Sequence, residues 1–248
     1  MQSVVFAHDG ASYQFARESA DGAEVRLFSH AYLAQENLLR QSITGGRTEA
    51  FRFQWQDHDL LLKHYRRGGY VRHFSKDKYL WTGLNGTRAF KEFALLQRLA
   101  DAGLPAPKPF ACRVEKHRWC YRTSLITHWV DNTASMTERV EDHPLPDRLW
   151  PEIGRVIRTF HDHHVCHEDL NGSNILIDDS DRVYIIDFDK AVVKKSSGDT
   201  KQGKAWRDAN LKRFERSLMR LSVKSNAFFF TPDIWSLFTE GYLGVNAD

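Results

Sequence analysis

The sequence predicts an α+β protein in two parts, a small antiparallel-sheet N-lobe followed by a mostly helical C-lobe. Two patterns predict this class. Apolar and polar side chains alternate over residues 51–56, which is the period of a half-buried strand. Apolar residues recur at three- and four-residue spacing over 89–100 and 150–160, which is typical of helices. We expect the N-lobe to span residues 1–130 and the C-lobe residues 131–248.

Composition sets the protein class. The chain has 248 residues, 42% of them hydrophobic and 27% charged, enough for a sizeable core in a globular protein. We find no secretory signal at the start and no run of roughly 20 apolar residues for a membrane span. The three cysteines lack a C-x-x-C pattern, which suits free thiols in a reducing compartment. We therefore expect a cytoplasmic protein that docks at most on a membrane surface.

The first strands of the N-lobe follow a glycine pair. Residues 1–37 carry no clear pattern, but residues 51–56 and 60–65 read as antiparallel partners joined by a turn at 57–58. Gly45 and Gly46 come just before them. Glycine lets backbone N–H groups approach a phosphate closely, so the pair is a candidate nucleotide-binding loop. An ordinary hairpin turn is the equally weighted alternative.

A helix over 89–100 follows and ends near Gly103. Glu92 lies beside its apolar stripe and is therefore able to reach the sheet, where Lys63 stands in the second strand. A strand lysine paired with a helix glutamate is the arrangement by which kinases hold nucleotide phosphates. The alternative is a surface glutamate that pairs with its neighbour Lys91.

Prolines then restrict residues 104–109 to an extended conformation. Strands are expected at 110–114 and 119–126, which complete the sheet, and residues 127–131 then form the connection between the lobes. In the C-lobe, we expect helices over 150–160 and 206–221, with a final apolar patch near the C-terminus that packs in the core.

The segment 167–174 indicates the chemistry. Asp169 and Asn174 are five residues apart, the spacing of the kinase catalytic loop H-R-D-L-x-x-x-N, and Asp187 with Phe188 takes the place of D-F in D-F-G. A hydroxyl nucleophile needs a carboxylate to orient it and accept its proton, and Mg²⁺ needs hard oxygen ligands. This stretch supplies both.

The plain alternative is that Asp and Asn between apolar runs only mark turns. Residues 178–181 fit that description, as a tight turn between two strands. Residues 169–174 fit it less well, because a turn does not need a histidine, two acids and an asparagine followed by a further acid at the end of a buried strand. A zinc site in the His-rich run 161–167 is disfavoured, because its spacing matches no closed zinc pattern. His167 is expected to brace the loop by hydrogen bonding.

Together these residues predict an ATP- and Mg²⁺-dependent kinase. Asp169 is the candidate catalytic residue that orients the acceptor hydroxyl. Asn174 and Asp187 are the candidate metal ligands. Lys63, held by Glu92, is the candidate ligand of the nucleotide phosphates, and their order along the chain makes coincidence less probable than for any single motif.

Cations and aromatic rings alternate over residues 63–81, where Arg66 and Arg67 stand side by side. Such a mixture suits an anionic lipid headgroup or a phosphorylated acceptor, so the two arginines are candidate acceptor-binding residues. A solvated surface loop is the alternative. The net charge of only +3 argues against a nucleic-acid partner.

Several longer motifs resemble the 3-deoxy-D-manno-octulosonic acid (Kdo) kinases of lipopolysaccharide core assembly, members of the protein-kinase-like superfamily. They are residues 65–69, 79–83, 87–93, 103–109, 167–174 and 186–189. The resemblance covers the chain from about residue 40 onward. It implies a two-lobed protein-kinase-like fold and ATP-dependent phosphorylation of the 4-hydroxyl of Kdo on Kdo-lipid A. It further implies a peripheral location on the cytoplasmic face of a Gram-negative inner membrane. No obligate protein partner is evident from the sequence.

Glu168 replaces the arginine of H-R-D, the residue that pairs with a phosphorylated activation loop. This favours a constitutive metabolite or lipid kinase. The glycine loop is short, and Asp189 stands where D-F-G has glycine. Three alternatives stay open: a protein kinase, another small-molecule phosphotransferase of the same fold, and a lipid-binding pseudokinase without turnover.

Overall fold

The structure is a computed structural model that describes residues 3–16, 22–45, 48–65, 79–195, 200–225 and 227–244. The chain divides into two compact units, which we describe separately. Unit 1 contains Met1–Ala102 and Pro107–Trp129, and unit 2 contains Gly103–Ala106 and Val130–Asp248. Antiparallel sheet and helices are both present, so the α+β class predicted from the sequence is confirmed.

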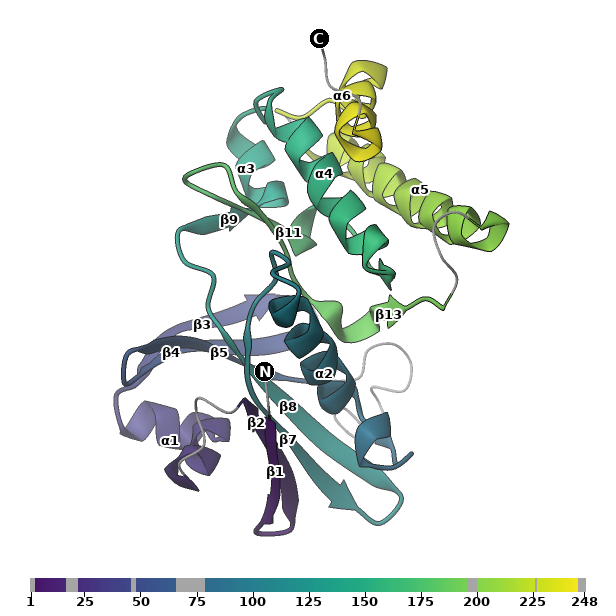
Figure 1. The fold of residues 1–248 in the computed structure, drawn as a ribbon. Coiled ribbons are helices and arrows are strands. Elements are labelled where there is room, and N and C mark those ends of the chain that lie inside the picture. The colour runs from purple at the N-terminus through teal and green to yellow at the C-terminus, as the bar shows by residue number, and fades with distance from the viewer. Residues whose placement is uncertain are drawn as a thin grey trace. The chain divides into compact units, whose positions relative to one another are not determined.

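Unit 1 is built on an antiparallel sheet of eight strands (Figure 1). Seven follow one another in the order β1-β2-β7-β8-β5-β4-β3, and β6 pairs with β8. The strands are β1 (Ser3–His8), β2 (Ala11–Ala16), β3 (Leu39–Gly45), β4 (Thr48–Trp55), β5 (His58–His64), β6 (Tyr79–Leu80), β7 (Pro109–His117) and β8 (Cys120–His128).

The predicted N-lobe strands are present. The alternating stretch 51–56 lies in β4, and its predicted partner is β5, with Ala50 opposite Lys63 and Phe51 opposite Leu62. The two later predicted strands lie within β7 and β8. Period-two alternation located β4, in which Phe51 and Phe53 are buried and the residues after each of them are partly exposed.

The N-terminal residues, for which the sequence showed no pattern, extend and cover this sheet. The β1–β2 hairpin adds to the edge at β7. The 3₁₀ helix η2 (Gly22–Phe28) and the short helix α1 (His30–Gln35) contribute Leu27, Phe28 and Leu33 to a buried cluster with Phe53 and Leu62. Helix α1 has only six residues, too few for the helical period to stand out.

Helix α2 (Arg88–Asp101) packs against β7 and β8 and buries Phe90, Phe93, Leu96 and Leu99, as the apolar spacing predicted. A short 3₁₀ turn, η4 (Leu84–Gly86), precedes it, and Gly103 follows its end with a φ of +70°. Lys63 of β5 contacts this helix, whereas its neighbour Leu62 points into the cluster on the other side of the sheet. Unit 1 is therefore a sheet with α2 on one face and α1 on the other.

Unit 2 is mostly helical (Figure 1), with α3 (Met136–Asp142), α4 (Leu149–Asp162), α5 (Lys201–Lys224) and α6 (Pro232–Leu243). Its short strands are β9 (Thr133–Ser135), β10 (Val165–Cys166), β11 (Ile175–Asp178), β12 (Val183–Ile185) and β13 (Val192–Val193). The 3₁₀ helices η5 (Gly172–Asn174) and η6 (Phe188–Lys190) lie between them. The predicted helices over 150–160 and 206–221 lie within α4 and α5.

Candidate active site

Two short strands of unit 2 hold the ends of the candidate catalytic segments. After α4 the chain enters β10, which pairs antiparallel with β13, so that Cys166 lies opposite Val192. Residues 167–174 leave this ladder at the same end at which residues 187–190 approach it. Because antiparallel strands run in opposite directions, segments that are distant in the sequence come together here.

The loop from Asp169 to Asn174 closes on a single carbonyl group. The side-chain amides of Asn171 and Asn174 both donate to the backbone oxygen of Asp169, at 2.8 and 2.9 Å. The Oδ1 atom of Asn171 accepts from the N–H of Ser173 at 2.9 Å and caps η5. Because the Asn174 amide nitrogen donates to the loop, its oxygen is the atom that is suited to a metal ion.

The β11–β12 hairpin carries Asp187 to Asn174. Ile175 lies opposite Ile185 in this pair, and the N–H of Ile186 donates to the Asn174 carbonyl at 3.0 Å. Asp187 is the next residue. It has φ 63° and ψ 63°, a left-handed conformation that is uncommon for residues other than glycine. Such conformations cluster at functional sites, and here one turns the chain into η6.

His167 and Phe188 connect the two segments. The Nε2 atom of His167 lies 2.9 Å from the Ile186 carbonyl and therefore donates to it. Its ring packs edge-on against Phe188, with centroids 5.2 Å apart, and burial lowers the pKa of the imidazole. Phe188 is itself buried and stacks on Phe160 of α4. The prediction that His167 braces the loop by hydrogen bonding is confirmed.

A buried polar network supports this loop from the helices. Asn210 of α5 donates to the His167 carbonyl at 2.8 Å and lies 3.0 Å from Nε2 of His161 in α4. The Nδ1 atom of His161 lies 2.8 Å from the Tyr242 hydroxyl of α6. Burial is the main reason that the pKa of His161 falls to about 4, so the ring is neutral at pH 7.

The carboxylate of Asp169 contacts a lysine that sequence reasoning missed. The Nζ atom of Lys190 lies 2.6 Å from its Oδ2, and both side chains are about half exposed. Lys190 ends η6, three residues after Asp187. A basic residue soon after a D-F motif was visible in the sequence, but nothing there showed that the β10–β13 pairing would bring it to Asp169.

Unit 1 brings together the predicted lysine and glutamate. Nζ of Lys63 lies 3.5 Å from Oε1 of Glu92, whose carboxylate is buried. The hydroxyl of Tyr65, two residues after Lys63 in the chain, donates to Oε2 of Glu92. The Lys63 ammonium also lies 4.9 Å from the centre of the Tyr65 ring. Glu92 therefore holds two groups that come from the sheet.

Of the remaining predicted residues, the structure describes only Gly45. It pairs with Thr48 at the end of the β3–β4 ladder. Gly46 itself lies outside the described residues, as do Arg66 and Arg67 and most of the stretch 63–81. Their predicted roles stay predictions.

Within the described ranges, no three His, Cys, Asp or Glu side chains gather in a group that would hold a metal ion. The predicted set differs in kind, because one of its two ligands is the amide oxygen of Asn174. An amide oxygen and the Asp187 carboxylate are hard donors, the type that Mg²⁺ prefers, and Mg²⁺ completes its octahedron with water and substrate phosphates. The donor chemistry at this point fits Mg²⁺.

Comparison with known proteins agrees with the motifs. The sequence profile of the lipopolysaccharide kinase (Kdo/WaaP) family matches residues 33–242. A 3-deoxy-D-manno-octulosonic acid kinase of Photobacterium profundum is 37% identical over 215 residues, 87% of each chain. The protein of that name from Vibrio cholerae is 42% identical over 183 residues, 74% of each chain.

A third relative with this name, from Mannheimia succiniciproducens, is 34% identical over 242 residues and covers 95% of this chain and 97% of its own. The resemblance stated from the motifs is thereby confirmed, and so is the prediction of a phosphotransferase with an alcohol group as acceptor. The chain belongs to the lipopolysaccharide kinase (Kdo/WaaP) family.

Proposed function

We propose that this protein transfers the γ-phosphoryl group of ATP to the 4-hydroxyl of Kdo on Kdo-lipid A, in lipopolysaccharide inner-core biosynthesis. Family membership and the names of the relatives support the reaction and the acceptor class. The main observation that supports the proposal is a series of hydrogen bonds in unit 2. It links Asp169 to Asn174, Asn174 to Ile186, and Ile186 to His167.

In this mechanism Asp169 orients the acceptor hydroxyl and accepts its proton as the oxygen attacks phosphorus. Lys190 holds Oδ2 of this carboxylate at 2.6 Å, which leaves Oδ1 for the hydroxyl. The Asn171 and Asn174 amides fix the backbone of Asp169, so the carboxylate is positioned before the acceptor binds.

Asn174 and Asp187 would hold Mg²⁺, which neutralises charge on the phosphate oxygens when it is bound. His167, through Ile186, keeps Asp187 at the required point of the chain. In unit 1, Glu92 orients Lys63 toward the nucleotide phosphates, and Tyr65 holds the second oxygen of Glu92. The glycine pair at 45–46 and the arginines at 66 and 67 remain candidates for the nucleotide and the acceptor respectively.

We further propose that the enzyme acts at the cytoplasmic face of the inner membrane as a peripheral protein. A lipid-linked acceptor requires access to a membrane surface. Among the described residues, no helix combines the length and the apolar character needed to cross a bilayer.

The experiment that tests the reaction is mass spectrometry of acceptors incubated with the purified protein, ATP and Mg²⁺. We expect Kdo-lipid A to gain the mass of one phosphoryl group, which NMR then assigns to O4 of Kdo. Lipid A without Kdo, a general protein substrate and an aminoglycoside serve as comparison acceptors and should stay unmodified. Phosphate on the protein acceptor alone would indicate a protein kinase, and absence of Mg²⁺-dependent ATP binding would indicate a pseudokinase.

A further inference from the structure

Two large apolar side chains are exposed together at one end of unit 1. Trp119, in the turn between β7 and β8, is 84% exposed, and Leu80 of β6 is 72% exposed. Leu80 lies opposite Cys120 in the β6–β8 pair, and the N–H of Trp81 donates to the Trp119 carbonyl at 2.9 Å. The two side chains therefore come from adjacent backbone segments at the same end of the sheet.

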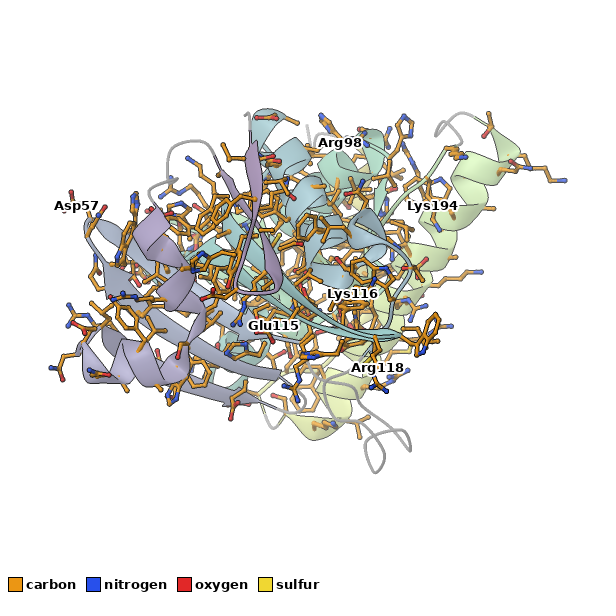
Figure 2. All side chains as sticks on the ribbon, turned by 90° about the horizontal axis from the view of Figure 1, so that it is seen from below. Asp57, Arg98, Glu115, Lys116, Arg118 and Lys194 are labelled. Atoms are coloured by element: carbon orange, nitrogen blue, oxygen red, sulfur yellow. The ribbon has the colours of Figure 1, made fainter. Side chains whose placement is uncertain are left out.

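Exposed cations come from strands β7 and β8 and the turn between them. Lys116, Arg118 and Arg122 are exposed, and Figure 2 shows Lys116 and Arg118 at the end of the hairpin. The Lys116 ammonium lies 4.8 Å from the centre of the Trp81 ring. The chain has no acidic residue from Lys116 to Val130, although its net charge is only +3. We call this feature the tip surface, formed by Leu80, Trp81, Lys116, Arg118, Trp119 and Arg122.

Glu115, the acidic residue next to Lys116 in the sequence, already has a cationic partner. Glu115 of β7 accepts from the guanidinium of Arg113, two residues earlier on the same strand. The side chains of Lys116 and Arg118 therefore lie at the end of the hairpin without a carboxylate between them in the sequence. The charge of the tip surface is positive.

We propose that the tip surface docks the enzyme on an anionic lipid bilayer. Insertion of tryptophan and leucine side chains at the boundary between headgroups and acyl chains is favourable. Lysine and arginine side chains nearby reach the lipid phosphates. Each cation near an anionic surface strengthens binding about fivefold. Exposed apolar side chains beside cations match the chemistry of this partner, whereas a neutral protein groove would offer the cations no opposite charge.

This inference deepens the proposed function, because it names the surface through which the kinase reaches a membrane-borne acceptor. It depends on that function only for its purpose, since binding to vesicles is measured without any acceptor or ATP. The two claims can therefore fail separately.

The test is flotation of the full chain with vesicles of phosphatidylethanolamine and phosphatidylglycerol, and with vesicles of phosphatidylcholine alone. One variant removes charge, Lys116→Ala with Arg118→Ala, and one removes apolar surface, Leu80→Ser with Trp119→Ser. Matched controls change exposed residues elsewhere: Arg98→Ala with Lys108→Ala for charge, and Val223→Ser with Phe229→Ser for apolar surface. Thermal unfolding of each variant checks that the fold is kept.

We expect the wild type and both controls to float with anionic vesicles and not with phosphatidylcholine alone. The charge variant should bind roughly 30-fold more weakly, as expected for the loss of two cations, and the apolar variant should also lose binding. Folded tip variants that float like the wild type would overturn the proposal. A wild type that binds no vesicles would overturn it as well and would favour a protein partner for this surface.

Turnover then separates the two claims. Tip variants should phosphorylate acceptor dispersed in detergent at the wild-type rate and lose activity only on acceptor embedded in vesicles. Equal loss on both forms would contradict a docking role. If the wild type modifies neither form, the proposed function fails, and the vesicle binding still stands or falls on the flotation result.

Discussion

Lys190 is the residue whose role in the site we assign from the structure alone. Its ammonium group binds the carboxylate of Asp169, and η6 and the β10–β13 pair fix where it lies. Residues 167–174 contain no lysine or arginine, and Asn171 caps η5 with its side chain. A positive charge beside Asp169 therefore has to come from another segment, and Lys190 provides it.

Replacing Lys190 should impair catalysis more than binding of ATP. We expect Lys190→Met to lower turnover roughly 10- to 100-fold, the range for losing a hydrogen bond to a charged group. The KM for ATP should change little, because Lys190 contacts Asp169 rather than a nucleotide ligand. Steady-state kinetics on Kdo-lipid A measures both constants.

Two comparisons make this prediction specific. Lys190→Arg should recover part of the lost turnover, since it restores a donor near Oδ2. Lys194→Met removes a neighbouring cation that pairs with Glu168 at 3.4 Å and should have little effect. If the Lys190 and Lys194 variants lose activity equally, the ion pair with Asp169 has no special role.

Replacing Glu92, unlike replacing Lys190, should impair binding of ATP. We expect Glu92→Gln to raise the KM for ATP about tenfold, because Lys63 loses its charged partner and a buried hydrogen-bond network is disturbed. The KM for the acceptor should stay near its wild-type value. Glu36→Gln, at the exposed end of α1, is the matched control. An increase in the acceptor KM alone would show that Glu92 supports binding of the acceptor and not of ATP.

At the scale of elements, the candidate catalytic loop of unit 2 depends on the helices that hold it. His161 of α4, Asn210 of α5 and Tyr242 of α6 meet in one buried network that ends on the His167 carbonyl. Buried networks of this kind tolerate substitution poorly, because each loss leaves a partner unsatisfied. Helix packing and loop geometry are thus coupled.

His161 makes this coupling depend on pH. Burial lowers its pKa to about 4 in the folded protein, while in the unfolded chain the imidazole has its ordinary pKa of 6.5. The unfolded state therefore binds the proton more tightly, and folding stability falls as pH drops from 6.5 to about 4. The contribution lost is about 3 kcal/mol. Above pH 6.5 both states are neutral, and the group contributes no pH dependence.

Chemical denaturation of the wild type and of His161→Gln at a series of pH values checks this. The variant lacks the titrating ring, so its free energy of unfolding should approach that of the wild type as pH falls through this window. A difference between the two proteins that stays constant with pH would contradict the assignment of the shift to His161.

The crossing of α4 and α6 offers a test of packing. A Cβ added at Gly241 would meet the backbone of Pro151, and one at Gly154 would meet the backbone of Phe238 and Tyr242. Backbone atoms cannot give way, so we expect Gly241→Ala to lower the free energy of unfolding by about 1–3 kcal/mol. Ser236→Ala, at an exposed position of the same helix, should be close to neutral. Equal stability of both variants in urea denaturation would show that the helices separate readily.

Sequence patterns predicted elements in proportion to their length and burial. Helix α2 and strands β4 and β5 were readable because each repeats its period several times against one core. Strands β10 and β13 have two residues each, which is too short for a strand to show alternating apolar and polar residues. The contact of Lys190 with Asp169, which depends on that pairing, could not be predicted for the same reason.

At the scale of the whole molecule, each unit carries its own set of predicted residues. Unit 1 joins Lys63 to Glu92, and unit 2 links Asp169, Asn174 and Asp187 through neighbouring backbone groups. The spacing of the motifs predicted both sets, because it matches the spacing that kinases use for the same residue types. The N-terminal cover of the sheet was not predicted, and neither was the pairing that places residues 80–81 beside the β7–β8 turn, since both depend on sheet registers.

The central claim is that Asp169 activates the acceptor within this set. The most direct test is the single-turnover rate of phosphoryl transfer from ATP to Kdo-lipid A for the wild type, Asp169→Asn and the exposed control Asp179→Asn. We predict that Asp169→Asn lowers the rate about 10²- to 10⁴-fold while the affinity for ATP and the fold are kept. An Asp169→Asn protein that transfers phosphate at the wild-type rate would contradict the account.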